Sequence, residues 1–113
     1  MNKKALLLVS ALLLPLVASA APKGDAEAGK AKSQVCQACH GPDGNGIGDP
    51  QYPLIAGQYA DYLEKSLHDY RSGERSNPIM QGFASTLSDE DIRDLAAFFA
   101  SQPTKLWDLD GIK

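Results

Sequence analysis

The run Cys36-Gln37-Ala38-Cys39-His40 constrains this chain more than any other feature of its 113 residues. Its two cysteines are the only ones in the sequence, and they stand too close together to clamp a long loop as a disulfide. Cys-x-x-Cys-His is the attachment signature of c-type haem. Two thiols at this spacing can each form a thioether to one of two neighbouring vinyl groups, and a helical turn places His40 on the same side. We therefore predict one covalent haem c, held by Cys36 and Cys39, with His40 as the fixed iron ligand.

Two other uses of this motif fit the sequence less well. A thioredoxin-like redox pair lies beside a strand-helix-strand pattern, and no persuasive strand follows the first twenty residues. A zinc site needs four ligands, whereas the chain offers only His68 as a further histidine. Haem attachment is the interpretation that this motif and the secretory pattern of residues 1–20 support together.

The first twenty residues have the pattern of a secretory signal peptide. Two lysines precede an apolar run over residues 5–17, and residues 18–20 are small, as a cleavage site requires. A membrane anchor is the alternative, but the run has thirteen residues, whereas a bilayer span takes about 20. We predict cleavage after Ala20 and a mature chain, residues 21–113, that lies in the periplasm without an integral membrane anchor.

Removal of the signal peptide leaves nine Lys and Arg against fourteen Asp and Glu, a net charge of −5. This charge argues against nucleic acid or an anionic membrane as a partner, because both attract a basic face. It favours protein partners, and it predicts salt-dependent docking to a basic patch on them.

Helical spacing and capping residues predict two helices before residue 73. Asp25 is a suitable N-cap for a first helix over residues 26–32, which runs toward the cysteines. Apolar residues at helical spacing predict a second helix over residues 58–72, with Gly73 just past its end.

A third helix has the clearest signals, because Ser88 and Asp91 have the spacing of a capping box and Pro103 stops the pattern. The segments between the helices, 41–57 and 73–86, are predicted loops, and the first of them is rich in Gly and Pro. So long a loop is uncommon in a compact domain, unless it wraps a large ligand. The sequence predicts a small all-α domain with three main helices and long loops around one haem.

Four segments carry a resemblance to a known family. They are Gly-Asp-Ala-Glu-Ala-Gly-Lys-Ala, Val-Cys-Gln-Ala-Cys-His-Gly-Pro-Asp-Gly, Tyr-Pro-Leu-Ile-Ala-Gly-Gln and Leu-Ser-Asp-Glu-Asp-Ile-Arg-Asp-Leu-Ala-Ala-Phe-Phe-Ala-Ser-Gln. Through them the chain resembles the bacterial class I c-type cytochromes, and most closely one half of the dihaem cytochromes of that class. One Cys-x-x-Cys-His implies a single-haem version. The resemblance implies a cytochrome c domain over residues 21–102, with residues 103–113 as a C-terminal tail of unassigned role.

The sixth iron ligand decides what such a protein does, because an open position admits oxygen or peroxide. After removal of the signal peptide, only Met80 and His68 offer a thioether or a second imidazole. Met80 lies in the loop before the third helix, where the resemblance places the ligating methionine, rather than on a helix stripe as a core gap-filler. His68 sits in the middle of the second helix, directed away from its apolar stripe. We predict Met80 as the distal ligand and a structural role for His68.

Other residues are expected around the haem. The resemblance implies that the Pro53 carbonyl accepts a hydrogen bond from His40, and a ligating imidazole usually gives its other N–H to such an acceptor. A plain turn proline is the alternative. Further candidates for the haem cavity include the apolar Ile55, Tyr59 and Phe83. Arg75 is a candidate donor to the haem propionates, and a solvated loop charge is the alternative.

Ligation by histidine and methionine implies one-electron transfer between ferrous and ferric iron with no substrate on the metal. We therefore predict an electron-transfer protein rather than an enzyme. It would be a monomeric, periplasmic monohaem carrier in respiration, between an upstream donor and an acceptor such as a terminal oxidase or a reductase. Two alternatives stay open: a haem enzyme or gas or peroxide sensor with a labile sixth ligand, and an electron-transfer subunit of a larger complex.

Overall fold

The computed structural model describes residues 20–105, and this part of the chain contains five helices joined by loops. In chain order they are α1 (Ala26–Lys32), α2 (Gln34–His40), α3 (Ala60–Ser72), α4 (Pro78–Ala84) and α5 (Asp89–Ala100). These described residues contain no strand, which confirms the predicted all-α class. None of their helices is long and apolar enough to cross a bilayer. Residues 1–19 of the predicted signal peptide and residues 106–113 of the predicted tail lie outside the described range.

The first predicted helix is present, but the chain breaks it before the cysteines. Asp25 caps α1 with its side chain, which accepts hydrogen bonds from the backbone N–H groups of Glu27 and Ala28. At Ser33 the hydroxyl donates to the Lys30 carbonyl at 2.8 Å, and α1 ends. The next residue opens α2, which therefore carries the whole Cys-x-x-Cys-His motif as a separate short helix.

The second predicted helix begins two residues later than expected, at Ala60. Tyr59 has a φ of −59° and a ψ of 133°, outside the helical region, and its N–H is bound by the Gln58 side chain at 2.9 Å. The predicted end is confirmed, because Gly73 follows α3 in the left-handed conformation, with a φ of +85°. A glycine adopts this conformation without the strain that a Cβ atom adds.

The predicted loop over residues 73–86 is partly wrong, since it contains α4. Asn77 caps this helix through its side-chain oxygen, which accepts from the N–H groups of Ile79 and Met80. Pro78 occupies the first helical position, where its missing N–H removes no hydrogen bond. Met80 therefore lies on a short helix and not on a loop.

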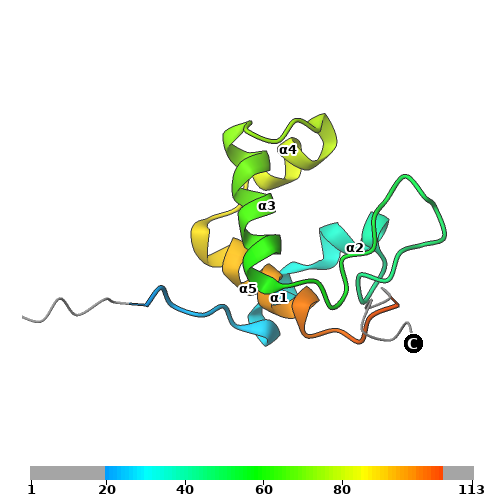
Figure 1. The fold of residues 1–113 in the computed structure, drawn as a ribbon, viewed down its shortest axis with the longest axis horizontal. Coiled ribbons are helices and arrows are strands. Elements are labelled where there is room, and N and C mark those ends of the chain that lie inside the picture. The colour runs from blue at the N-terminus through cyan, green and yellow to red at the C-terminus, as the bar shows by residue number, and fades with distance from the viewer. Residues whose placement is uncertain (1–19, 106–113) are drawn as a thin grey trace, which may run out of the picture.

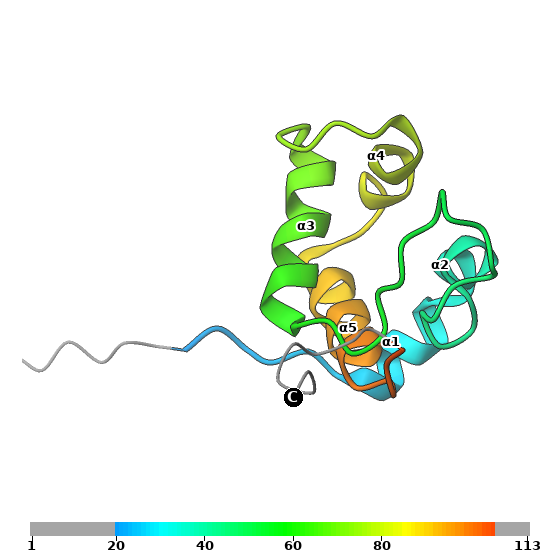
Figure 2. The same cartoon turned by 45° about the vertical axis from the view of Figure 1, so that its right-hand side comes forward.

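The last helix, α5, forms the centre of the core. Its Ser88 and Asp91 make both hydrogen bonds of the predicted capping box. The buried core cluster combines residues of this helix with one residue of α3; its members are Leu63, Leu95, Ala96, Phe98 and Phe99. In Figures 1 and 2, α3 stands beside α5, and α4 lies at the far end of α3.

Helix α1 crosses α5 at very short range. A Cβ atom placed on Gly29 would stand 1.9 Å from the Asp94 carbonyl oxygen, so only glycine permits this approach. The crossing lies at the base of the molecule in Figure 2, and it brings the first and last helices together.

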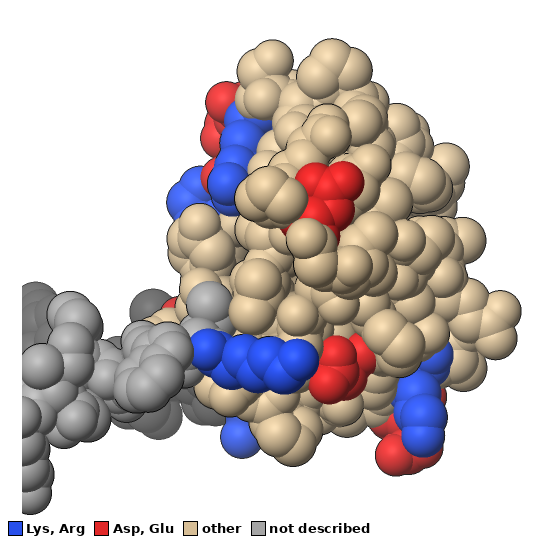
Figure 3. All heavy atoms as spheres, turned by 90° about the vertical axis from the view of Figure 1, so that its right-hand side faces the viewer, with Lys and Arg blue, Asp and Glu red and all other residues tan. Residues whose placement is uncertain are grey.

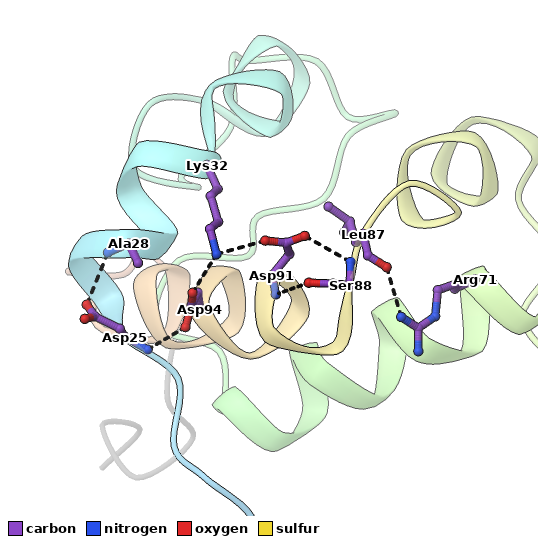
Figure 4. A network of polar contacts seen from close by, with 8 residues as sticks. All are labelled: Asp25, Ala28, Lys32, Arg71, Leu87, Ser88, Asp91 and Asp94. Carbon is purple, nitrogen blue, oxygen red and sulfur yellow. Dashed lines mark hydrogen bonds and ion pairs between the residues drawn. The ribbon is translucent and has the colours of Figure 1, made fainter.

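Charged side chains hold the same crossing together (Figure 4). Lys32 Nζ lies 2.8 Å from carboxylate oxygens of both Asp91 and Asp94. The buried Asp94 carboxylate also accepts from the Asp25 N–H at 2.8 Å. The Lys32 ammonium lowers the pKa of Asp91 to about 2, and the Asp25 N–H, followed by Lys32, lowers the pKa of Asp94. The α1–α5 crossing thus combines a close backbone contact at Gly29 with an ionic cluster.

Candidate functional site

A cavity of about 490 Å³ opens between α2, the 41–57 loop, α3, α4 and α5. Its volume lies in the range of about 300 to 1,000 Å³ typical of ligand sites. It brings together eight of the nine residues that the sequence analysis assigned to the site: Cys36, Cys39, His40, Pro53, Ile55, Arg75, Met80 and Phe83. These residues are spread over more than forty positions of the chain, and the fold collects them around one space.

Tyr59 is the exception and corrects the prediction. Its side chain is 79% exposed and does not line the cavity. Because Tyr59 precedes the first turn of α3 instead of belonging to it, its side chain does not follow the inward face of that helix. Tyr62, in the first turn, lines the cavity in its place.

Helix α2 presents the thiols and the imidazole to this cavity. Cys36, Cys39 and His40 all line it, as expected of positions three and four apart on a helix. Both cysteines are free and half-buried. Burial raises the pKa of the Cys36 thiol, so this sulfur keeps its proton at neutral pH.

A hydrogen bond to the backbone fixes the His40 ring at Nδ1. His40 is only 7% exposed, and its Nδ1 lies 2.8 Å from the Pro53 carbonyl oxygen. A carbonyl oxygen can only accept, so Nδ1 carries the hydrogen and donates it. The other ring nitrogen, Nε2, then keeps its lone pair free to bind a metal.

Met80 reaches the cavity from a different direction. Helices α2 and α4 make no contact in the described chain, and Figure 2 shows them apart, yet both contribute lining residues. The Asn77 cap and Pro78 fix the first turn of α4, which carries Met80. His68, the other candidate ligand, is not among the lining residues; its Nδ1 lies 3.0 Å from Arg71 Nη2.

Arg75 is the one lining residue with a fixed charge in the described range. Its guanidinium lies 4.8 Å from the centre of the Tyr70 ring, and its Nη1 donates to the Ser66 hydroxyl at 3.2 Å. Within residues 20–105 it has no carboxylate partner. The sequence analysis did not find Ser66 or Tyr70, although Tyr62, Ser66 and Tyr70 recur at every fourth position, which is one face of a helix.

The cavity fits a large apolar ligand that carries acidic groups at one edge. Its walls include the buried Leu95 and Phe99, and no aspartate or glutamate of the described chain lines it. Figure 3 shows that most of the molecular face on the side of α2 and the 41–57 loop is uncharged. Two thiols and an imidazole in the order Cys-x-x-Cys-His are the groups that attach haem of the c type, and the cavity adds a thioether and apolar walls. Fold and site together define a small all-α domain that binds haem.

Comparisons with known proteins agree with this class. Residues 26–103 match the model of the Cytochrome c family, and the chain belongs to this family. Haem c is therefore its cofactor, as predicted from the sequence. Cytochrome c4 of Pseudomonas aeruginosa is 52% identical over 103 residues, which are 90% of this chain and 49% of the relative. Cytochrome c-554(548) of Halomonas halodenitrificans is 50% identical over 82 residues, which are 70% of this chain and 98% of the relative.

A solved structure gives the same result for the fold. The crystal structure of reduced recombinant cytochrome c4 from Pseudomonas stutzeri superimposes with a TM-score of 0.69 at 43% identity, and the match covers 74% of this chain and 48% of that chain. The chain thus spans about half the length of the cytochrome c4 relatives that it matches. This confirms the resemblance to one half of a dihaem class I cytochrome.

Proposed function

We propose that this chain is a single-haem electron carrier in which His40 and Met80 would hold the haem iron. When bound, the haem supplies an iron that alternates between the ferrous and ferric states. One observation carries the proposal: His40, with Nδ1 fixed by Pro53, and Met80, on the separate helix α4, line the same cavity. With both iron ligands supplied by the protein, no position would remain for a substrate, which favours electron transfer over catalysis.

The lining residues assigned to the haem site then have distinct roles. Cys36 and Cys39 would hold the porphyrin covalently, through thioether bonds that addition of each S–H across a vinyl group would supply. The Pro53 carbonyl keeps the His40 ring oriented and makes Nε2 a stronger donor to iron. Ile55 and Phe83 contribute apolar walls that keep water from the porphyrin.

Arg75 is proposed as the partner of a haem propionate. An unpaired guanidinium at the cavity wall is held in place by the Tyr70 ring and the Ser66 hydroxyl, and a carboxylate is its natural partner. A nearby positive charge favours the ferrous state, which carries less positive charge. Arg75→Gln should lower the reduction potential, whereas Arg93→Gln, on α5 and outside the cavity, should leave it near the wild-type value. Equal potentials in wild type and Arg75→Gln would remove Arg75 from this role.

The cellular setting is part of the proposal. The signal-peptide pattern of residues 1–20 supports a periplasmic location. A relative from Stutzerimonas stutzeri, named thiosulfate dehydrogenase electron acceptor, is 43% identical over 84% of this chain. We infer that this protein likewise receives single electrons from a dehydrogenase or another donor and passes them to a reductase or a terminal oxidase.

The test combines covalent attachment with ligand binding. A haem-stained denaturing gel of the exported protein should show a band that survives denaturation. In the ferrous protein, Met80 should keep carbon monoxide from the iron at neutral pH. Met80→Leu preserves the apolar volume but lacks the sulfur, so it should bind carbon monoxide readily and have a lower potential. Gln81→Ala is the matched control, because Gln81 is the exposed neighbour on α4 and does not line the cavity.

The results separate carrier from sensor. If the wild-type ferrous protein binds carbon monoxide as readily as Met80→Leu does, the sixth position is open and the carrier proposal fails in favour of a gas or peroxide sensor. Absence of stain from the exported wild-type band would refute the covalent attachment of haem.

A further inference from the structure

Asn45 connects two parts of the chain that are far apart in sequence. Its Oδ1 accepts from the Lys105 N–H at 2.8 Å, and its Nδ2 donates to the Pro103 carbonyl at 2.8 Å. One amide side chain thus pairs with the backbone on both sides of Thr104, as a neighbouring strand does. The second Nδ2 hydrogen goes to Asp43 within the same loop, again at 2.8 Å. Residues 103–105, which we call the C-terminal strap, are therefore held against the 41–57 loop.

The strap also rests on the far end of that loop. A Cβ atom built on Gly57 would stand 2.5 Å from the Thr104 Cβ, so the strap and the loop backbone are in direct contact there. The Gly57 N–H donates to the Phe99 carbonyl at 2.9 Å, which fixes the same point to α5. The strap consequently touches the 41–57 loop near both of its ends, at Asn45 and at Gly57.

The backbone on either side of Asn45 leads directly to His40. On one side, the Gly46 N–H donates to the His40 carbonyl at 2.7 Å. On the other side, the Gly44 carbonyl accepts from the N–H groups of Ile55 and Ala56, at 2.8 and 3.0 Å. This second contact fixes the segment that holds Pro53, two residues before Ile55.

We propose that Asn45 and the C-terminal strap position the Pro53 carbonyl against the His40 ring, and so tune the proximal ligand from outside the cavity. None of these strap contacts reaches the cavity, because Asn45 and residues 103–105 do not line it. The strap fixes the loop, the loop fixes Pro53, and Pro53 fixes the Nδ1 hydrogen of His40. The functional meaning rests on the proposed role of His40 as iron ligand. The C-terminal strap would then influence the haem site, although it follows the last helix and does not line the cavity.

The measurement is hydrogen exchange at His40 Nδ1, by nuclear magnetic resonance on the ferrous, haem-loaded mature protein with nitrogen-15 histidine. Asn45→Ala removes both amide contacts to the strap. Lys105→Pro removes only the N–H that Asn45 Oδ1 accepts, and Lys105→Gln is its matched control, because it keeps the N–H and removes the charge. Asp49→Ala is the control within the loop, since the Asp49 side chain accepts from the Gln51 N–H, at 2.9 Å, and makes no hydrogen bond to the strap.

Exchange at His40 Nδ1 should rise roughly tenfold or more in Asn45→Ala, since both hydrogen bonds to the strap are lost, and by a smaller factor in Lys105→Pro. Lys105→Gln and Asp49→Ala should match the wild type. The reduction potential of Asn45→Ala should rise as well, because a less firmly bound Nδ1 hydrogen makes the imidazole a weaker donor to ferric iron.

Two results would overturn the inference. One is exchange at His40 Nδ1 that stays at the wild-type rate in both Asn45→Ala and Lys105→Pro. The other is an increase matched by the backbone amide of Leu95 in the core, because this would mean that the strap only stabilises the whole domain. A haem-stained gel of each variant distinguishes the two proposals. If the electron-carrier proposal fails, the wild-type band itself lacks the stain. If only the strap proposal fails, wild type and variants all keep the stain.

Discussion

Removal of the Asp94 carboxylate should lower the free energy of unfolding more than removal of an exposed ion pair in the described chain does. Asp94→Ala deletes two hydrogen bonds, from the Asp25 N–H and from Lys32 Nζ, both at 2.8 Å. Hydrogen bonds to charged groups contribute about 1.5 to 3 kcal/mol each. The lower value applies here, because the Lys32 side chain is 33% exposed and water screens part of the attraction. The expected loss is about 3 kcal/mol of unfolding free energy at pH 7.

That loss is large for a domain of this size, whose whole stability is about 4 to 13 kcal/mol at 0.05 to 0.15 kcal/mol per residue. Urea unfolding of the haem-loaded protein, followed by circular dichroism, gives the free energy directly. Asp89→Asn is the matched control, since its carboxylate pairs with Arg71 at the surface with 64% of the side chain exposed. This control should lose much less stability than Asp94→Ala, because water screens an exposed ion pair.

The effect should also depend on pH with a definite sign. The folded-state pKa values of Asp91 and Asp94 lie below the ordinary value of 3.8, and that of Asp91 is about 2. The stability that these carboxylates contribute is therefore complete above pH 3.8 and is lost as the pH falls toward 2. The difference between wild type and Asp94→Ala should shrink over this interval. A loss below 1 kcal/mol at pH 7, or a difference that is the same at pH 2.5 and pH 7, would refute the reasoning.

Three further substitutions have clear expected outcomes. Gly29→Ala should cost about 3 kcal/mol or more in urea unfolding, because its Cβ would meet backbone atoms of α5 that cannot rotate away; a wild-type midpoint would contradict the close crossing. Leu95→Ala should cost about 2 to 5 kcal/mol in the same assay, since this side chain is 1% exposed, and a cost below 1 kcal/mol would mean that the core closes around it. Tyr59→Ala should change stability by less than about 0.5 kcal/mol and leave the reduction potential unchanged in a redox titration. A shifted potential would return Tyr59 to the haem site.

The sequence was most informative where a local rule acts alone. The capping box of Ser88 and Asp91 depends on residues three apart, and the structure contains both of its hydrogen bonds. Gly73 ends α3 for an equally local reason, its left-handed conformation. The cysteines and His40 fall on one helix, so their common orientation also follows from spacing.

Two errors in the predicted helices have local causes that the sequence did contain. Asn77 followed by Pro78 is a helix start, with an N-cap and a proline at the first position, although residues 73–86 are predicted as one loop. The predicted start of α3 at residue 58 is two residues too early, because the Gln58 side chain binds the Tyr59 N–H and delays the first turn. The start of α4 follows from capping chemistry alone.

Other features could not be predicted, because they depend on partners distant in sequence. Asp94 meets Lys32 across 62 positions, and Asn45 meets Pro103 across 58. Nothing in the neighbourhood of Asn45 indicates that its amide binds the backbone beyond α5. The same holds for the complete burial of Ser33, a polar residue between two short helices. A single sequence gives the periodicity of a helix, but it does not give the partner that the helix meets.

The close crossing of α1 and α5 has a consequence for biosynthesis. In the proposed export, α1 leaves the cytoplasm first, whereas the surface that covers Gly29 belongs to residues 89–100 and follows late. The first helix and the Cys-x-x-Cys-His segment next to it therefore lack their α5 partner until nearly the whole polypeptide has crossed the membrane. Such a topology delays closure of the domain, so the two cysteines would still be accessible for haem attachment while the chain is arriving.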